Sequence, residues 1–306
     1  MLTVLIQMSL LIACGTFWRS HAPAHIPAMA HRRALTDLVF YLLLPALVLD
    51  VIWTAPLNTS TLKISLLASA GIATALASMW LVLRLLKTTS KQTGALLLAA
   101  SFPNATYLGL PVLDQVLGSH TRSTVLQYDL LACTPILLTF GILLASYYGD
   151  SDKALHPLRE LMKVPPLWAV TIGITLNLTG IEQPVILHSG LSVLGGGVVP
   201  LMLIVLGMSI PWNSFRLRFL GLLLPVVVIA LLVVPFTVFS LSHVINLKAE
   251  LVMIVSLLAA MPTMVFGIVI CERYQLDSEL YAAAVMLTTL SSLLTLPLWF
   301  HWLSIS

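Results

Sequence analysis

The chain has 306 residues, of which 59% are hydrophobic and only 9% are charged, and its mean hydropathy is +1.01. Soluble domains carry about 25% charged residues, so the composition excludes a soluble globular domain. A helix needs about 20 apolar residues to cross a bilayer, and the sequence predicts a multi-pass protein embedded in a lipid bilayer. The net charge of +3 gives no indication of nucleic-acid binding, because the 15 Lys and Arg residues are dispersed among short loops.

The cysteines give no indication of a metal site or a cofactor. Cys14, Cys133 and Cys271 are widely separated and lie within or at the ends of apolar stretches. Disulfide frameworks and metal sites need closer and more regular spacing. The zinc-protease, nucleotide-loop and nucleophile-elbow motifs are also missing from the sequence. We therefore expect no metal, no cofactor and no enzymatic activity.

Residues 1–18 are predicted to form the first transmembrane helix. The alternative is a cleaved lipoprotein signal, because Leu11 to Cys14 has the character of such a cleavage site. A signal peptide begins with a positively charged region, and no Lys or Arg precedes this apolar run. The transmembrane interpretation is therefore favoured.

Apolar runs separated by charged residues predict an all-α protein with ten transmembrane helices. The residues between 19 and 33 are expected to be a polar connection, and residues 149–163 a cytoplasmic linker between two five-helix halves, 1–148 and 164–306. The ten predicted helices cover residues 2–19, 35–54, 61–86, 93–117, 123–148, 164–180, 189–210, 217–241, 249–271 and 279–302.

The loops differ sharply in positive charge. Loops that follow odd-numbered helices carry twelve Lys and Arg residues, and those that follow even-numbered helices carry three, namely Lys63, Arg122 and Lys248. Lys and Arg accumulate in cytoplasmic loops. The sequence thus predicts a protein of the cell (inner) membrane with both termini on the outer, periplasmic side.

The predicted fourth and ninth helices are each interrupted near the middle. Pro103 and Pro111 cannot donate backbone hydrogen bonds, and Gly109 weakens the helix further. Pro262 interrupts the ninth helix at a similar depth. Because the breaks lie about twelve and thirteen residues into their spans, both fall near the membrane midplane. Interrupted segments at matching positions in two halves indicate an inverted-repeat transporter with its site at the breaks.

A simple kink is the alternative interpretation of each proline. Pro45 and Pro200 also lie at matching depths, but they lack polar neighbours and are interpreted as kinks. Pro135 and Pro297 share no common depth and are interpreted in the same way.

The two breaks carry the side chains of a predicted binding site. A broken helix exposes N–H groups with partial positive charge, which bind carboxylates without Lys or Arg. The alternative for the asparagine is that its amide only satisfies backbone freed by Pro103, and the alternative for the large side chains is plain packing. The predicted polar ligands are Ser101, Asn104, Thr106 and Thr263, and the predicted apolar walls include Tyr107 and Met264.

Acidic residues inside the spans are candidates for coupling. Asp129 lies in the fifth helix and is a possible proton carrier, with a hydrogen-bonded structural Asp as the alternative. Asp50 and Asp114 lie near the outer ends of helices and are expected to face water. The breaks contain no acidic residue, so a sodium site there would rest on carbonyl and hydroxyl oxygens.

Several segments resemble the auxin efflux carrier family, which includes plant PIN proteins and many bacterial permeases. Residues 102–112 look like its Pro-Asn…Gly-Ile/Leu-Pro-Leu crossover motif. Residues 261–263, 271–274 and 296–298 resemble its last two helices, and residues 41–47 resemble its second helix. The similarity extends over the whole length of the chain.

The resemblance implies two inverted five-helix repeats with crossed helices 4 and 9, akin to bile-acid/sodium symporters. It implies a scaffold of helices 1, 2, 6 and 7, a mobile transport domain of helices 3–5 and 8–10, elevator-type alternating access and a homodimer. It also implies that Asn104 binds substrate. The central loop of about fourteen residues is short for a plant carrier, and Thr263 replaces a frequent Gln. Both differences argue against indole-acetate itself, and bacterial relatives are often assigned to malonate, malate or other organic acids.

Together these features predict a secondary transporter of a small organic anion, either auxin-like or a mono- or dicarboxylate. One alternative is a sodium- or proton-coupled symporter or exchanger of another solute on the same fold. A second alternative, from a different class, is a membrane sensor that binds a ligand without transporting it.

Overall fold

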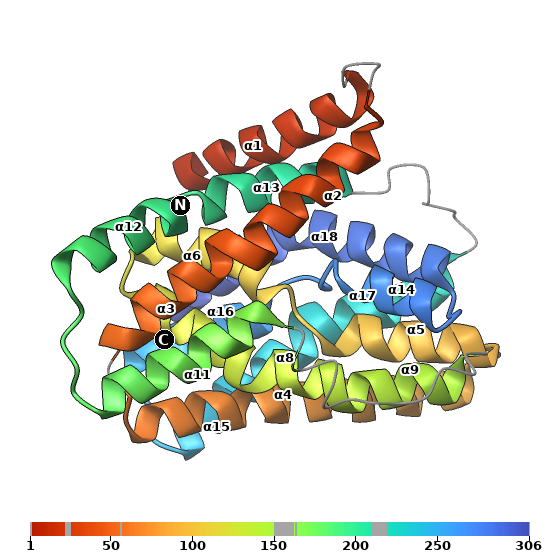
Figure 1. Ribbon diagram of the computed structural model, residues 1–306. Helices are drawn as coiled ribbons and strands as arrows, with labels where there is room; N and C mark the ends of the chain where they lie inside the picture. The colour runs from red at the N-terminus through yellow and green to blue at the C-terminus, as the bar shows by residue number, and fades with distance from the viewer. Residues whose placement is uncertain are drawn as a thin grey trace. The chain divides into compact units, whose positions relative to one another are not determined.

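The computed structural model describes residues 2–21, 26–55, 57–149, 162, 164–209 and 219–305, and every regular element in this part is helical (Figure 1). Six helices are long and apolar enough to span a membrane, and Pro165–Leu178 and Ala249–Ala259 are shorter apolar helices. The prediction of an all-helical, multi-pass membrane protein is thereby confirmed. The six long helices are Ala28–Thr54, Thr59–Leu85, Thr121–Tyr148, Val185–Ser209, Leu220–Val244 and Ser278–Ile305.

Each of the ten predicted spans overlaps helix in the described residues. The number that crosses the membrane stays a prediction, because fewer helices meet the length and hydropathy of a span. One expected boundary is wrong: the second helix begins at Ala28, within the expected polar connection. The charged pair Arg32 and Arg33 ended the apolar run in the sequence, but a helix tolerates charges where it leaves the bilayer.

The chain divides into two compact units, and each is built from both halves of the sequence. The first unit comprises residues 1–61, 106–126 and 159–210, and the second comprises residues 62–105, 127–158 and 211–306. The two parts of the broken fourth helix therefore belong to different units. The predicted inverted repeats relate the two halves of the sequence to each other, and this division into units does not test them. The repeats therefore stay a prediction.

In the first unit, two helices pack at very short range, α1 (Leu2–His21) and α13 (Val198–Ser209). A Cβ atom added at Gly15 or at Gly207 would overlap the backbone of the facing helix. Thr16 Oγ1 donates to the Gly207 carbonyl at 3.2 Å across the same contact. Small residues let helix backbones approach in this way in membranes, where packing and hydrogen bonds hold helices together.

The rest of the first unit is organised around α3 (Leu44–Thr54), which packs on α11 (Pro165–Leu178) and α12 (Val185–Gly196) and continues from α2 (Ala28–Leu38). The Asn177 amide donates to three carbonyls at the end of α3, those of Ile52, Trp53 and Ala55, at 2.7–3.2 Å. The last carbonyls of a helix have no partner within it, so Asn177 serves as a cap from another helix. α6 (Leu110–Leu117) and most of α7 (Thr121–Tyr128) also lie in this unit.

The second unit contains the segments that form the candidate site. α5 (Ser90–Ser101) starts with a capping box in which Thr89 and Gln92 satisfy each other's backbone N–H groups. α18 begins after Asp277, whose carboxylate accepts from the Leu280 N–H at 2.9 Å. Its other helices are α4 (Thr59–Leu85), α8 (Thr134–Ile136), α9 (Ile142–Tyr148), α14 (Leu220–Val228), α15 (Val234–Val244), α16 (Ala249–Ala259), α17 (Gly267–Arg273) and α18 (Ser278–Ile305).

Wide π-helical turns stand directly before four prolines. The turns Val39–Leu43, Ala105–Gly109, Asp129–Cys133 and Ile229–Val233 end two residues before Pro45, Pro111, Pro135 and Pro235. A proline lacks an N–H and its ring clashes with the carbonyl four residues earlier. That carbonyl lies within the wide turn in every case, so the extra residue per turn accommodates the proline without ending the helix.

Candidate functional site at the crossing of two broken helices

Both predicted breaks are present, and both lie in the part of the chain that the structure describes. α5 ends at Ser101, and helical structure resumes at Ala105. α16 ends at Ala259 and α17 begins at Gly267. The residues in between are unwound at Pro103 and at Pro262, as the sequence predicts.

The two unwound stretches pair with each other. Pro103 and Thr263 form an isolated antiparallel bridge. The Asn104 N–H donates to the Pro262 carbonyl at 2.8 Å, and the Met264 N–H donates to the Phe102 carbonyl at 3.0 Å. A proline has no N–H to donate, so the N–H groups of Asn104, one residue after Pro103, and of Met264, two residues after Pro262, supply the bonds. In lipid an open backbone is tolerated only where protein or a wet cavity covers it, and here each break covers the other.

Hydroxyl groups fix this crossing to the neighbouring helices. Thr263 Oγ1 donates to the Ala99 carbonyl of α5 at 2.7 Å, and the Thr263 N–H donates to Thr288 Oγ1 of α18 at 3.1 Å. Ser101 Oγ donates to the Leu97 carbonyl in its own helix at 2.7 Å. The hydroxyl protons of Ser101 and Thr263 are thus used inside the protein, which favours a positioning role for these two predicted ligands.

The supporting residues of α18 were not predicted from the sequence. The Tyr281 hydroxyl donates to the Met264 carbonyl at 2.9 Å, and a Cβ atom at Gly267 would overlap the ring of Tyr281. Thr288 and Tyr281 are both buried. Hydroxyl groups within an apolar helix indicate that a hydrogen-bond partner is present, because buried hydroxyls need partners. The sequence does not identify that partner.

Asn104 differs from its neighbours because its side chain is buried and unpaired. The residue is 1% exposed, and among the described residues neither Nδ2 nor Oδ1 of its amide has a hydrogen-bond partner. Leaving a buried polar group unsatisfied costs about 1–3 kcal/mol. The alternative role of satisfying backbone freed by Pro103 does not apply here, since the amide makes no such bond in the described structure. The Asn104 amide is therefore not committed to any other group in the described part of the chain.

The other predicted site residues follow Asn104 or flank it. Thr106 is buried and Tyr107 is half-buried in the wide turn that ends at Gly109. Met264 is buried next to the bridge. The turn begins at the boundary between the two units.

The crossing is tightly packed on the side of the wide turn Ile229–Val233 and of α15. Residues of both breaks, together with Ala230 and Val234, line a cavity of about 10 Å³. Small side chains such as Ala99 and Ala259 form much of the lining, so the space on this face of the crossing is small.

Asp129 lies in the wide turn Asp129–Cys133 and is buried. Its Oδ1 accepts a hydrogen bond from Thr134 Oγ1 at 3.2 Å. The bond is consistent with the structural alternative, and a role in proton coupling stays a prediction.

The expectation that Asp50 faces water is wrong. Asp50 is only 9% exposed, and its Oδ1 accepts from Gln183 Nε2 at 2.8 Å and lies 2.8 Å from His188 Nδ1. Both partners come from segments more than 130 residues later, which the sequence position alone does not reveal. Asp114 makes a two-bond ion pair with Arg122, at 2.6 and 2.8 Å, and its side chain is only 12% exposed.

A multi-pass helical protein in which two broken helices pair has the construction of a membrane transporter. The family model described as membrane transport protein matches residues 1–300. The chain therefore belongs to this family, which is the auxin efflux carrier family that its motifs resemble.

Several named relatives are transporters. One from Methanothermobacter thermautotrophicus is 29% identical over 210 residues, covering 69% of this chain and 68% of the relative. One from Methanocaldococcus jannaschii is 25% identical over 281 residues, covering 88% and 89%. The transporter YfdV of Escherichia coli K12 is 21% identical over 220 residues, covering 70% and 69%. Their names state transport without a substrate.

Proposed function

We propose that the protein is a secondary transporter of a small organic anion and that Asn104 binds the carboxylate of the substrate. The buried, unpaired amide of Asn104 at the crossing is the observation that carries this proposal. An amide NH₂ offers two donors, and one of them can donate to a carboxylate oxygen. The substrate class is an auxin-like acid or a mono- or dicarboxylate.

The surrounding chemistry supports reversible binding of an anion. Neither residues 101–111 nor residues 259–270 contain Lys, Arg, Asp or Glu. Helix N-termini attract anions through their N–H groups and partial charge, and the segments after Ala105 and Gly267 begin new helical runs beside the bridge. Uncharged N–H donors can bind a carboxylate without forming a buried ion pair. Such a site can also release its substrate, as a transporter must.

Elevator-type movement is part of the proposal. The expected scaffold helices 1, 2, 6 and 7 fall in the first unit, and helices 3 and 8–10 with most of helix 5 fall in the second. Membership of the family supports movement of such a transport domain against a scaffold, and it also supports a homodimer. Location in the inner membrane with outward termini is proposed from the charge asymmetry of the loops.

The test is transport by purified protein in proteoliposomes. A panel of labelled mono- and dicarboxylates is offered to the wild type and to Asn104→Ala. The control for transport is Asn58→Ala, at an exposed residue whose side chain accepts only from the Ser60 N–H among the described residues. We expect Asn104→Ala to lower transport at least tenfold and to leave the thermal unfolding temperature unchanged or higher, because no bond is lost. Carboxylate transport at the wild-type rate by Asn104→Ala would remove Asn104 from the site.

Proton coupling is a second possibility that the buried Asp129 favours. Collapsing the pH gradient is then expected to slow transport by the wild type and not by Asp129→Asn. Replacement of Na⁺ by K⁺ separates sodium coupling from proton coupling. Substrate binding without any flux would instead indicate a sensor.

A further inference from the structure

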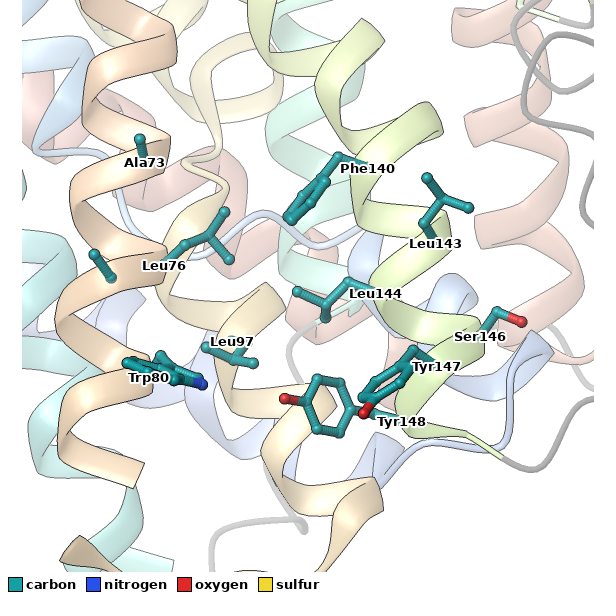
Figure 2. A pocket seen from close by; sticks show the side chains of 11 residues that line it. Ala73, Leu76, Trp80, Leu97, Phe140, Leu143, Leu144, Ser146, Tyr147 and Tyr148 are labelled. Atoms are coloured by element: carbon teal, nitrogen blue, oxygen red, sulfur yellow. The ribbon is translucent and has the colours of Figure 1, made fainter. Parts of the chain in front are cut away.

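An apolar groove lies in the second unit, away from the crossing. It has a volume of about 870 Å³ and runs between α4 and α9, with Leu97 of α5 at its floor (Figure 2). Leu76 and Leu144 face each other across it, and Phe140 lies toward one end. Its walls are hydrocarbon for most of their length, so the groove fits an apolar chain.

The other end of the groove is amphipathic. Figure 2 shows Trp80, Tyr147 and Tyr148 gathered at this end. Trp80 is 41% exposed and Tyr147 is 81% exposed. Trp and Tyr are enriched where a membrane protein passes from hydrocarbon to head groups, so this end marks the level of the lipid head groups.

Positive charge lies directly beyond the aromatic end. The Arg84 guanidinium lies over the Trp80 ring, 3.5 Å from its centroid, in the last turn of α4. Lys87 follows three residues later, and both side chains are exposed. Within the described residues neither Arg84 nor Lys87 has a carboxylate partner. These cations are available to a negatively charged group held at the mouth of the groove.

We propose that this groove binds an anionic glycerophospholipid of the surrounding bilayer. One acyl chain lies along Leu76 and Leu144, and the phosphate meets Arg84 and Lys87. From Phe140 to Tyr148 the groove extends about 12 Å at 1.5 Å per residue, which is close to one leaflet of a hydrocarbon core about 30 Å thick. The apolar walls, the aromatic end and the unpaired cations follow one another in the order in which a lipid presents tail, glycerol and phosphate.

The groove and its charged end favour lipid over a protein partner. An apolar helix on this surface would leave Arg84 facing hydrocarbon, which is costly. A phosphate satisfies the guanidinium with two hydrogen bonds. Lipid binding here is independent of the substrate proposed above, because no residue of the crossing lines this groove.

Native mass spectrometry of the detergent-purified protein tests the proposal, with phosphatidylglycerol and phosphatidylcholine of equal chain length as probes. The wild type is expected to retain phosphatidylglycerol at a concentration at least fivefold lower than phosphatidylcholine. Ala77→Trp, which fills the groove from an exposed position, is expected to abolish retention, and Leu294→Trp, on an exposed position of α18, is the matched control. Arg84→Gln is expected to remove the preference for the anionic lipid, whereas Lys248→Gln is not.

Equal retention of both lipids by the wild type, or unchanged retention by Ala77→Trp, would overturn the proposal. A second measurement applies if Ala77→Trp does not fold. Stoichiometric phosphatidylglycerol with brominated acyl chains is expected to quench tryptophan emission in the wild type, and Trp80→Phe is expected to lose most of that quenching. Identical quenching in the two proteins counts against a lipid in this groove.

Discussion

Two kinds of polar side chain meet at the crossing, and they respond differently to substitution. Thr263 uses its hydroxyl to reach α5, whereas the Asn104 amide is unpaired. Thr263→Val keeps the shape and removes the bond to Ala99. Because a buried carbonyl then loses its donor, we expect a loss of about 1–2 kcal/mol in the free energy of unfolding.

Thermal unfolding in detergent measures this difference, with Thr263→Ser as the control that retains the hydroxyl. Asn104→Ala is expected to unfold at or above the wild-type temperature. If Asn104→Ala unfolds earlier than Thr263→Val, the assignment of the two roles is reversed.

Asp50 provides a second prediction for single residues. Its carboxylate is buried and holds Gln183 and His188, whereas the His188 side chain is 57% exposed. Asp50→Ala is expected to destabilise the protein by about 1–3 kcal/mol, since the Gln183 amide loses its partner. His188→Ala is expected to change stability by less than about 1 kcal/mol, as for exposed ion pairs. Equal losses in the free energy of unfolding, measured by chemical denaturation, would show that His188 contributes as much to stability as Asp50 does.

At this scale the sequence predicted which residue to examine but not its partners. Asn104 was predictable because a polar amide between two prolines is out of place in an apolar stretch. Thr288 and Tyr281 were not, since they act on residues 25 and 17 positions away through packing that no local pattern encodes. The burial of Asp50 was not predicted for the same reason, because its partners Gln183 and His188 lie more than 130 residues later in the chain.

Among the helices, wide turns before prolines leave carbonyls that need new donors. Pro235 cannot bond to the Leu231 carbonyl, and Trp299 Nε1 of α18 donates to it at 2.8 Å. Trp299→Phe removes that donor and is expected to lower the free energy of unfolding by about 1–2 kcal/mol. Trp302→Phe is the control, since within the described residues the Trp302 indole donates to no wide turn. Similar losses in both variants would assign the effect to ring packing.

α17 depends on one glycine for its position. A Cβ atom at Gly267 would overlap the Tyr281 ring, whose hydroxyl holds the Met264 carbonyl. Gly267→Ala is expected to displace the break and to lower carboxylate transport at least tenfold. Gly221→Ala, where an added Cβ meets nothing within 4 Å, is the matched control in the same proteoliposome assay. Wild-type transport by Gly267→Ala would show that the crossing adapts to the methyl group.

The helices themselves were largely predictable, because apolar length is a strong signal in membranes. The two breaks were predictable from Pro103 and Pro262. The π-helical turns were not predictable, since the sequence shows where each proline lies but not how the preceding turn changes its geometry to accommodate the proline. The early start of α2 was not predicted, because the apolar run ends at charged residues. A helix can continue through such residues outside the bilayer.

For the whole molecule, the charge asymmetry makes a prediction about orientation. Ser119 lies on an outer loop and Lys87 on a cytoplasmic loop if the positive-inside rule holds. With Cys14 replaced by Ser, a membrane-impermeant maleimide is expected to label Ser119→Cys in intact cells and to label Lys87→Cys only after lysis. The opposite pattern would invert the proposed topology.

Composition and hydropathy did not predict the division into two units, and the expectation of two domains drawn from both halves came only from the family resemblance. A boundary at residues 149–163 separates the halves of the chain, yet each compact unit draws segments from both halves. Such a division depends on contacts between segments that are distant in the sequence, and local composition gives no information about those contacts.

The small cavity at the crossing also bears on the membrane's ion gradients. Polar and unwound backbone inside a bilayer invites a file of waters, along which protons move. The cavity on this face of the crossing is only about 10 Å³ and its lining is mostly apolar, so it leaves little room for a chain of waters beside the open backbone. We expect the pairing of Pro103 with Thr263 to limit the passage of protons where the two helices are open.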